Sequence, residues 1–220
     1  MGDWITTDMS TDRRAGVLGS MGPQILSLES KRDHPSIRRL VEGVGMDRML
    51  QLVDDAKRLI DATREQPRGV AHNDCHSRNL FPVEEHGERI TYAIDWGSPG
   101  LAPVGVDGGS LAGAAMTWGQ SEADTIAKHE REVFSAYIDG LREAGWNGSE
   151  TDVRLAYLSQ VVTYVFFFPF IVLVTLETEH RNKEFFRSRL GVSDEVAVEQ
   201  CSERLTTFIH LIDEGLALVK

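Results

Sequence analysis

The chain has 220 residues, of which 41% are hydrophobic, and a formal net charge of −11. A chain of this length can bury a sizeable core, which predicts one domain or a tight pair of domains. Nucleic-acid binding needs clustered lysine and arginine, so the acidic balance argues against it. An acidic surface would suit a cationic small molecule, although such surfaces more often serve only to keep a protein in solution.

The cysteines and the apolar runs indicate where the chain resides. Cys75 and Cys201 are the two cysteines, far apart in the sequence, and the first residues lack the basic and apolar regions of a secretory signal. We therefore expect a reduced, cytoplasmic chain. The apolar run 161–176 is shorter than the about 20 residues of a membrane span, and Pro169 interrupts it. It predicts a buried, kinked helix.

The expected elements begin with turns, a helix and short strands. The first forty residues contain several glycines and little periodicity, so we expect them to be rich in turns. From Ile37 apolar residues recur at three- and four-residue spacings, which predicts a helix that Pro67 ends. Apolar alternation between turn residues then predicts three short strands, at 69–72, 80–83 and 90–94.

The remainder of the chain is expected to be helical. After a glycine- and proline-rich loop at 97–109, the predicted helices cover 107–118, 122–144, 151–177, 181–190 and 194–218. Ser193 is a candidate N-cap for the last of them, and Asp194 and Glu195 suit the positive end of a helix. The predicted fold class is α+β and mainly α, a helical bundle with a small β-hairpin region.

The polar residues that suggest chemistry lie around the predicted strands. His72 and Asp74 form an H-x-D motif that Asn79 follows after five residues, and Asp95 follows the apolar strand 90–94. Phosphoryl transfer needs a carboxylate beside the attacking hydroxyl and oxygen ligands that hold Mg²⁺ against the triphosphate. Two short strands can place Asn79 and Asp95 side by side, and the loop before them leaves Asp74 near the acceptor.

This motif resembles the catalytic loop and metal-binding acid of the aminoglycoside phosphotransferase and choline kinase-like family. The resemblance implies the C-terminal lobe of a protein kinase-like fold and an ATP-dependent phosphotransferase acting on a hydroxyl of a small molecule, such as an aminoglycoside or an amino alcohol. It implies ATP and Mg²⁺ as cofactors. By the same resemblance Asp74 would be the catalytic base or an acid that orients the substrate, and Asn79 and Asp95 would bind the metal. His72 and Asp107 would support the loop.

The sequence also predicts that the nucleotide-binding lobe of such kinases is absent. The resemblance covers about residues 40–120, and too few residues precede Asp74 for that lobe. Lys31 lies in a polar run and not in the strand that usually carries the phosphate-binding lysine. The segment from Trp4 to Met9 resembles the hinge strand through which these kinases enter their second lobe. We therefore expect a hinge-like segment in residues 1–40 and a catalytic lobe in residues 41–220.

Two alternatives to an active or weakly active kinase stay open. The chain could be a catalytically silent, kinase-like binding module, or one half of a split kinase. A surface that would otherwise face the first lobe favours association, so we expect a homodimer or a partner lobe at the N-terminal end. The other expected partner is a small-molecule substrate, with no nucleic acid and no membrane.

Other residue patterns offer weaker candidates. His72, Cys75 and His76 could belong to a zinc site, but no second pair of cysteines or histidines completes it. Cys75 as a nucleophile would need a base directed at it. The glycines between residues 16 and 22 do not match a phosphate-binding motif and are expected in turns. Acids of the later helices could bind a cationic substrate, although exposed helix-end acids are the simpler interpretation: Glu150, Asp152, Glu177 and Glu179.

Overall fold

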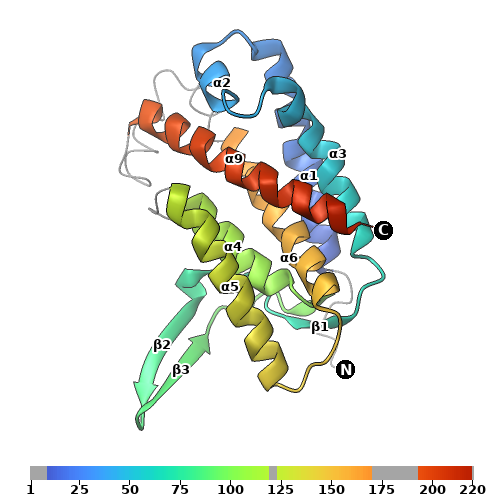
Figure 1. The fold of residues 1–220 in the computed structure, drawn as a ribbon, viewed down its shortest axis with the longest axis vertical. Helices are drawn as coiled ribbons and strands as arrows, with labels where there is room; N and C mark the ends of the chain where they lie inside the picture. Colours follow the sequence, from blue (N-terminus) through green and yellow to red (C-terminus); the bar gives the residue numbers. More distant parts are fainter. Residues whose placement is uncertain (1–8, 119–122, 170–192, 220) are drawn as a thin grey trace.

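The computed structural model describes residues 9–118, 123–169 and 193–219. The described chain is mainly helical with two small antiparallel sheets, which agrees with the predicted class (Figure 1). The helices are α1 (Met9–Ser27), η1 (Leu28–Lys31), α2 (Pro35–Leu40), α3 (Met46–Ala62), η2 (Ser77–Asn79), α4 (Val106–Trp118), α5 (Ala123–Glu143), α6 (Glu150–Val165) and α9 (Asp194–Leu218). The strands are β1 (Arg68–Ala71), β2 (Leu80–Glu85), β3 (Glu88–Ala93) and β4 (Gly100–Pro103).

The first described residues form a helix, so the prediction of a turn-rich start is wrong. Helix α1 contains Pro23 and the glycines between residues 16 and 22. Glycine lowers helix stability by about 1 kcal/mol relative to alanine, so packing against α3 and not local propensity holds this helix. Ile25 is fully buried in that contact region. The expected hinge strand from Trp4 lies outside the described residues except for Met9, which begins α1.

The helix predicted from Ile37 to Pro67 is divided in two. Helix α2 ends at Leu40, and α3 begins at Met46 after a turn. Gly45 adopts a φ of 81°, in the region that glycine enters without steric cost, and this residue is the N-cap of α3. The apolar periodicity continued across this turn because both helices face the same core.

The three predicted strands are confirmed, and a fourth was missed. Strands β2 and β3 form a hairpin with Leu80 opposite Ala93, and β1 pairs antiparallel with β4. Strand β4 lies in the glycine- and proline-rich stretch that the sequence indicated as a loop. The hairpin extends away from the helices (Figure 1), and the cross-strand pair Phe81 and Tyr92 is about half exposed.

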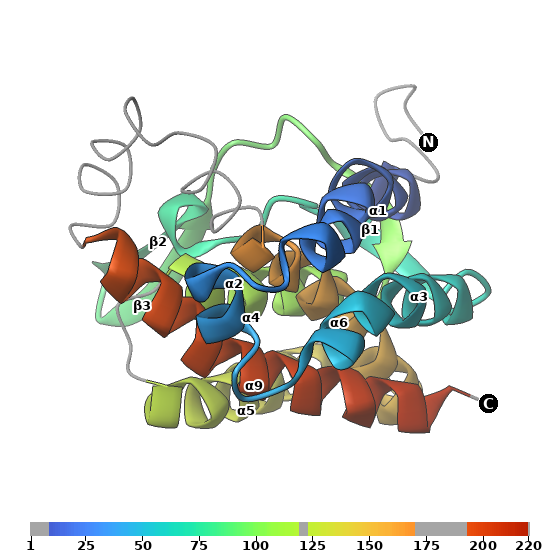
Figure 2. The same ribbon diagram turned by 90° about the horizontal axis from the view of Figure 1, so that it is seen from above.

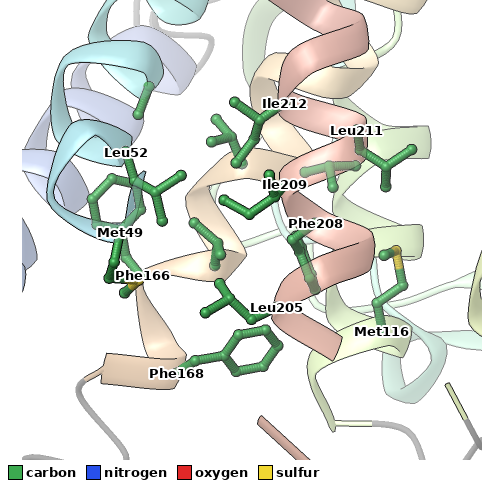
Figure 3. Packing of buried hydrophobic residues seen from close by; sticks show 14 of the residues in the cluster. Met49, Leu52, Met116, Phe166, Phe168, Leu205, Phe208, Ile209, Leu211 and Ile212 are labelled. Carbon is green, nitrogen blue, oxygen red and sulfur yellow. The ribbon is translucent and has the colours of Figure 1, made fainter. Parts of the chain in front are cut away.

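The core lies between helices α3, α6 and α9, with α6 near the centre of the view from above (Figure 2). The predicted helix 151–177 is confirmed from Glu150, but α6 ends at Val165, because Pro169 cannot donate to the carbonyl four residues earlier. Phe168 packs edge-on against Phe208 of α9, with ring centroids 5.2 Å apart (Figure 3). The rest of this prediction, 170–177, lies outside the described residues.

The other late helices follow the predictions closely. Helices α4, α5 and α9 begin and end within one residue of the expected bounds, while 181–190 lies outside the described residues. Ser193 is the N-cap of α9, since its hydroxyl accepts the Val196 N–H at 3.4 Å. Among the described helices, none combines the length and apolar character needed to cross a membrane.

Candidate active site

The loop after β1, residues 72–76, is held in place by the first turn of α4. One carboxylate oxygen of Asp107 accepts the His72 main-chain N–H at 2.7 Å, and the other accepts that of Asn73 at 2.9 Å. Burial raises the pKa of Asp107, although the two N–H donors act in the opposite direction. Asp107 thus joins the start of α4 to the main chain of the 72–76 loop.

His72 joins the 72–76 loop to the segment after β3. Its Nδ1 accepts the main-chain N–H of Asp74 at 3.3 Å, so the ring proton is on Nε2. Nε2 then donates to the Ile94 carbonyl at 2.7 Å, and the ring lies 4.6 Å from that of Trp96. Both ring nitrogens are used in structural hydrogen bonds, which agrees with the supporting role expected for His72.

Asp74 is oriented by residues from two different parts of the chain. Asn79 donates through Nδ2 to the Asp74 carbonyl at 3.0 Å. From α1, Arg13 donates to the Asn73 carbonyl at 2.8 Å and pairs with the Asp74 carboxylate at 3.3 Å. The Asp74 side chain stays 34% exposed, so the carboxylate is oriented but still open to a ligand. No motif in the sequence identified Arg13, because the contact depends on how α1 packs.

Asn79 and Asp95 lie at the base of the β2–β3 hairpin. Asn79 directly precedes β2, and its carbonyl accepts the Ile94 N–H at 3.0 Å, one residue before Asp95. Asp95 and Asn73 both have a φ of 60°, in the left-handed region, which aspartate and asparagine enter more readily than other residues that carry a Cβ. Asp95 is exposed, and its carboxylate has no partner among the described residues.

These two side chains suit Mg²⁺ by their chemistry. Mg²⁺ prefers oxygen ligands and is usually held by one or two carboxylates together with phosphate groups of a substrate. The amide nitrogen of Asn79 is already used, which leaves its Oδ1 for a cation, and Asp95 supplies a free carboxylate. Asn79 contacts Asp74 directly, whereas Asp95 is joined to Asn79 only through the main-chain hydrogen bond of its neighbour Ile94.

The alternatives built on Cys75 find no support in the described structure. Burial and the carboxylates of Asp107 and Asp74 raise the pKa of Cys75 to about 12, so its thiol is protonated at neutral pH. Within residues 9–118, 123–169 and 193–219, no three His, Cys, Asp or Glu side chains gather as a metal-binding group. A zinc site at His72, Cys75 and His76 is therefore not formed.

A cavity of about 370 Å³ opens beside Asp74. Helix α1 and the 72–76 loop form one side of it, and α4 and the C-terminal half of α6 form the other. On that second side, Ser110 and Tyr164 share a hydrogen bond of 2.8 Å, and burial raises the pKa of Tyr164, which keeps its hydroxyl neutral. The volume falls in the range of small-molecule sites.

The acids of the late helices do not contribute to this cavity where they are described. Glu150 and Asp152 lie at the opposite end of α6 from Tyr164, and the Ser149 hydroxyl accepts the Asp152 N–H as an N-cap. Glu177 and Glu179 lie outside the described residues. The cavity wall on α6 was missed by sequence reasoning, since Gln160, Thr163 and Tyr164 carry no motif.

Replacing Asp107 by alanine is expected to lower the free energy of unfolding by about 1–3 kcal/mol. The change removes the carboxylate that accepts two main-chain N–H groups, those of the buried residues His72 and Asn73. Asparagine restores one oxygen acceptor without the cost of burying a charge, so Asp107→Asn is expected between the wild type and Asp107→Ala.

Urea unfolding of the three proteins measures this order. Asp139→Ala is the matched control, because Asp139 is exposed on α5 and should change stability by no more than about 0.5 kcal/mol. Equal stability of Asp107→Ala and the wild type would show that Asp107 does not hold the loop.

One comparison with known proteins shows the family of the chain. The model of a family described as the phosphotransferase enzyme family matches residues 16–144. The matched span contains the 72–76 loop, Asn79, Asp95 and Asp107. Comparison with curated proteins and with solved structures gives no match.

Proposed function

Because the chain belongs to the phosphotransferase enzyme family, we propose that it transfers the γ-phosphoryl group of ATP to a hydroxyl group of a small molecule. The observation that supports this most directly is the position of Asp74. Its carboxylate is partly exposed, lines a cavity of small-molecule size, and lies on a loop that Asp107 and Asn79 hold.

Asp74 acts as the base in this proposal. The acceptor hydroxyl enters the cavity and donates a hydrogen bond to the Asp74 carboxylate. As the hydroxyl oxygen forms its bond to the γ-phosphorus, the bond from that phosphorus to the leaving ADP oxygen breaks, and the hydroxyl proton passes to Asp74 and then to water. The products are a phosphate ester and ADP.

Asn79 and Asp95 would hold the Mg²⁺ that accompanies the nucleotide. When bound, the ion supplies positive charge that offsets the charge of the phosphate oxygens. The hydrogen bond from the Ile94 N–H to the Asn79 carbonyl supports this assignment, because it joins the segments that carry the two side chains at the base of the hairpin.

Calorimetric titration with ATP in the presence and absence of Mg²⁺ tests the proposal. We expect Mg²⁺-dependent nucleotide binding by the wild type and loss of the Mg²⁺ dependence in Asp95→Asn, which removes one carboxylate ligand. A folded chain that binds no ATP with Mg²⁺ present would instead support the silent binding module. Phosphorus NMR of the same mixtures with a polyol added detects the phosphate ester directly.

A further inference from the structure

The cavity beside Asp74 is rich in positive charge, in contrast to the chain as a whole, whose net charge is −11. Among its described lining residues Asp74 is the single acid, whereas three are arginines, Arg13, Arg78 and Arg14, of which Arg14 is buried and donates to the hydroxyls of Ser159 and Thr63. Guanidinium groups keep their charge at any pH near neutrality, so this imbalance persists under all ordinary conditions. The charges of the side chains that line the cavity, and not the net charge of the whole chain, determine the electrostatic environment of a bound molecule.

The negative charge of Asp74 is already balanced before a ligand enters. Arg13 pairs with the Asp74 carboxylate at 3.3 Å while its other nitrogen donates to the Asn73 carbonyl. Arg78 is exposed on η2, directly before Asn79, and no carboxylate of the described part of the chain pairs with it. An anionic group entering the cavity would therefore meet a guanidinium that has no competing partner.

Two polar atoms of the loop also lack partners among the described residues. The Nδ1 of His76 and the Oδ1 of Asn73 are buried without a hydrogen bond, and both residues line the cavity. Buried polar atoms are normally satisfied, but these two have almost no surface that water can reach, so they lie behind the cavity wall and the charge preference does not rest on them. The other ring nitrogen of His76 lies 3.7 Å from the Asp74 carboxylate, which places this ring beside that acid.

The aromatic residues of the cavity could in principle attract a cation instead. Trp118 and Phe167 lie edge to face with centroids 5.5 Å apart. An aromatic face attracts a cation only weakly when solvent is near, and Trp118 is 42% exposed. Repulsion by the full charges of the nearby arginines opposes that attraction. We therefore expect the rings to pack against the carbon skeleton of the ligand.

We propose that the acceptor carries an anionic group, a carboxylate or a phosphate, close to the hydroxyl that faces Asp74, and that Arg78 with Arg13 selects it. The inference rests on the proposed function for the fate of the hydroxyl, but binding of the anion does not require phosphoryl transfer. It assigns the site a charge preference opposite to that of an aminoglycoside or an amino alcohol.

A set of six-carbon polyols that differ only in charge tests the preference. Gluconate is negative, sorbitol is neutral and glucamine is positive, while sorbitol 6-phosphate supplies the phosphate in place of the carboxylate. Calorimetric titration of the full chain without nucleotide is expected to show one of the two anionic polyols binding at least about tenfold more tightly than sorbitol, and glucamine more weakly. Which anion binds more tightly identifies carboxylate or phosphate. The proposal is overturned if neither gluconate nor sorbitol 6-phosphate binds more tightly than sorbitol. It is also overturned if glucamine binds more tightly than sorbitol.

Substitution of single arginines shows which residue causes the tighter binding of the anionic polyols. Arg78→Gln is expected to reduce the preference for the anion on the order of tenfold, Arg78→Lys to keep most of it, and added salt to weaken it. Arg131→Gln changes the net charge equally from an exposed position on α5 and is expected to leave it unchanged. Equal effects of Arg78→Gln and Arg131→Gln would show that only the overall charge matters.

The same titrations separate this inference from the proposed function. Tight binding of an anionic polyol that depends on Arg78, without ester formation when ATP and Mg²⁺ are added, would preserve the charge preference and reject the transfer reaction. Ester formation on glucamine but not on the anionic polyols would preserve the transfer reaction and reject the charge preference.

Discussion

Replacing Asp74 by asparagine is expected to lower the rate of phosphoryl transfer about 10²–10⁴-fold, the range that a positioned general base contributes. Asparagine has nearly the same shape and can still accept a hydrogen bond from the acceptor hydroxyl, but it cannot take up the proton. The ion pair with Arg13 is also lost, yet both side chains are partly exposed, so the fold should lose no more than about 1 kcal/mol.

Single-turnover assays of wild type and Asp74→Asn measure the rate of the chemical step. Nucleotide binding in the presence of Mg²⁺ should be retained, since the proposed metal ligands are Asn79 and Asp95. This distinguishes Asp74→Asn from Asp95→Asn, in which the Mg²⁺ dependence of nucleotide binding is lost as well. Asp139→Asn, on the exposed side of α5, controls for the change in charge. A rate in Asp74→Asn within a few-fold of the wild type would remove Asp74 from the role of base.

Replacing Gly109 by alanine is expected to lower the free energy of unfolding by about 3 kcal/mol, the upper end of the usual range for overpacking. The backbones of α4 and α6 touch at this position, and an added Cβ would overlap the Tyr157 carbonyl oxygen and lie 3.0 Å from the Cβ of Gln160. The main chain of a helix cannot relieve this overlap by rotating, as a side chain can, so α4 and α6 must move apart. Gly105 makes the same kind of contact one turn earlier, with the main chain at Val153 and Tyr157, whereas at Gly113 an added Cβ would meet the Tyr164 ring.

Gly140→Ala provides a matched control for this prediction. Gly140 lies in α5, and nothing is within 4 Å of a Cβ built there. The same substitution at this site should therefore stabilise the protein by about 0.5–1 kcal/mol through the helix propensity of alanine. Thermal or urea unfolding of both variants should give shifts of opposite sign, and a destabilisation of similar size in both would exclude helix contact as the cause.

Sequence patterns predicted the parts of the fold that depend on local information. The hairpin, the N-cap at Ser193 and the helices α4, α5 and α9 follow from periodicity, turn residues and capping, which act over a few residues. Helix α1 could not be predicted, because glycines and Pro23 lower its propensity and only packing against α3 compensates. Strand β4 was missed for the same reason, since its pairing with β1 joins segments about thirty residues apart.

The candidate site shows the same division. The order and spacing of His72, Asp74 and Asn79 identified the loop, because its geometry is formed within one short stretch of chain. The Asp107 contact agreed with the role that the family resemblance implied. Arg13 was not foreseen, since its contact spans 61 residues and depends on the packing of α1. The charge of the cavity therefore differs from what the acidic composition suggested.

The glycine contact between α4 and α6 also restricts how a substrate can be recognised. Asp107, which holds the loop, belongs to α4, and Tyr164, which lines the cavity, belongs to α6. Helices whose backbones already touch cannot move closer, and moving them apart would open the core beneath. We therefore expect the site to adapt to a ligand by side-chain rotation and by movement of its loops, and not by a change in the distance between α4 and α6.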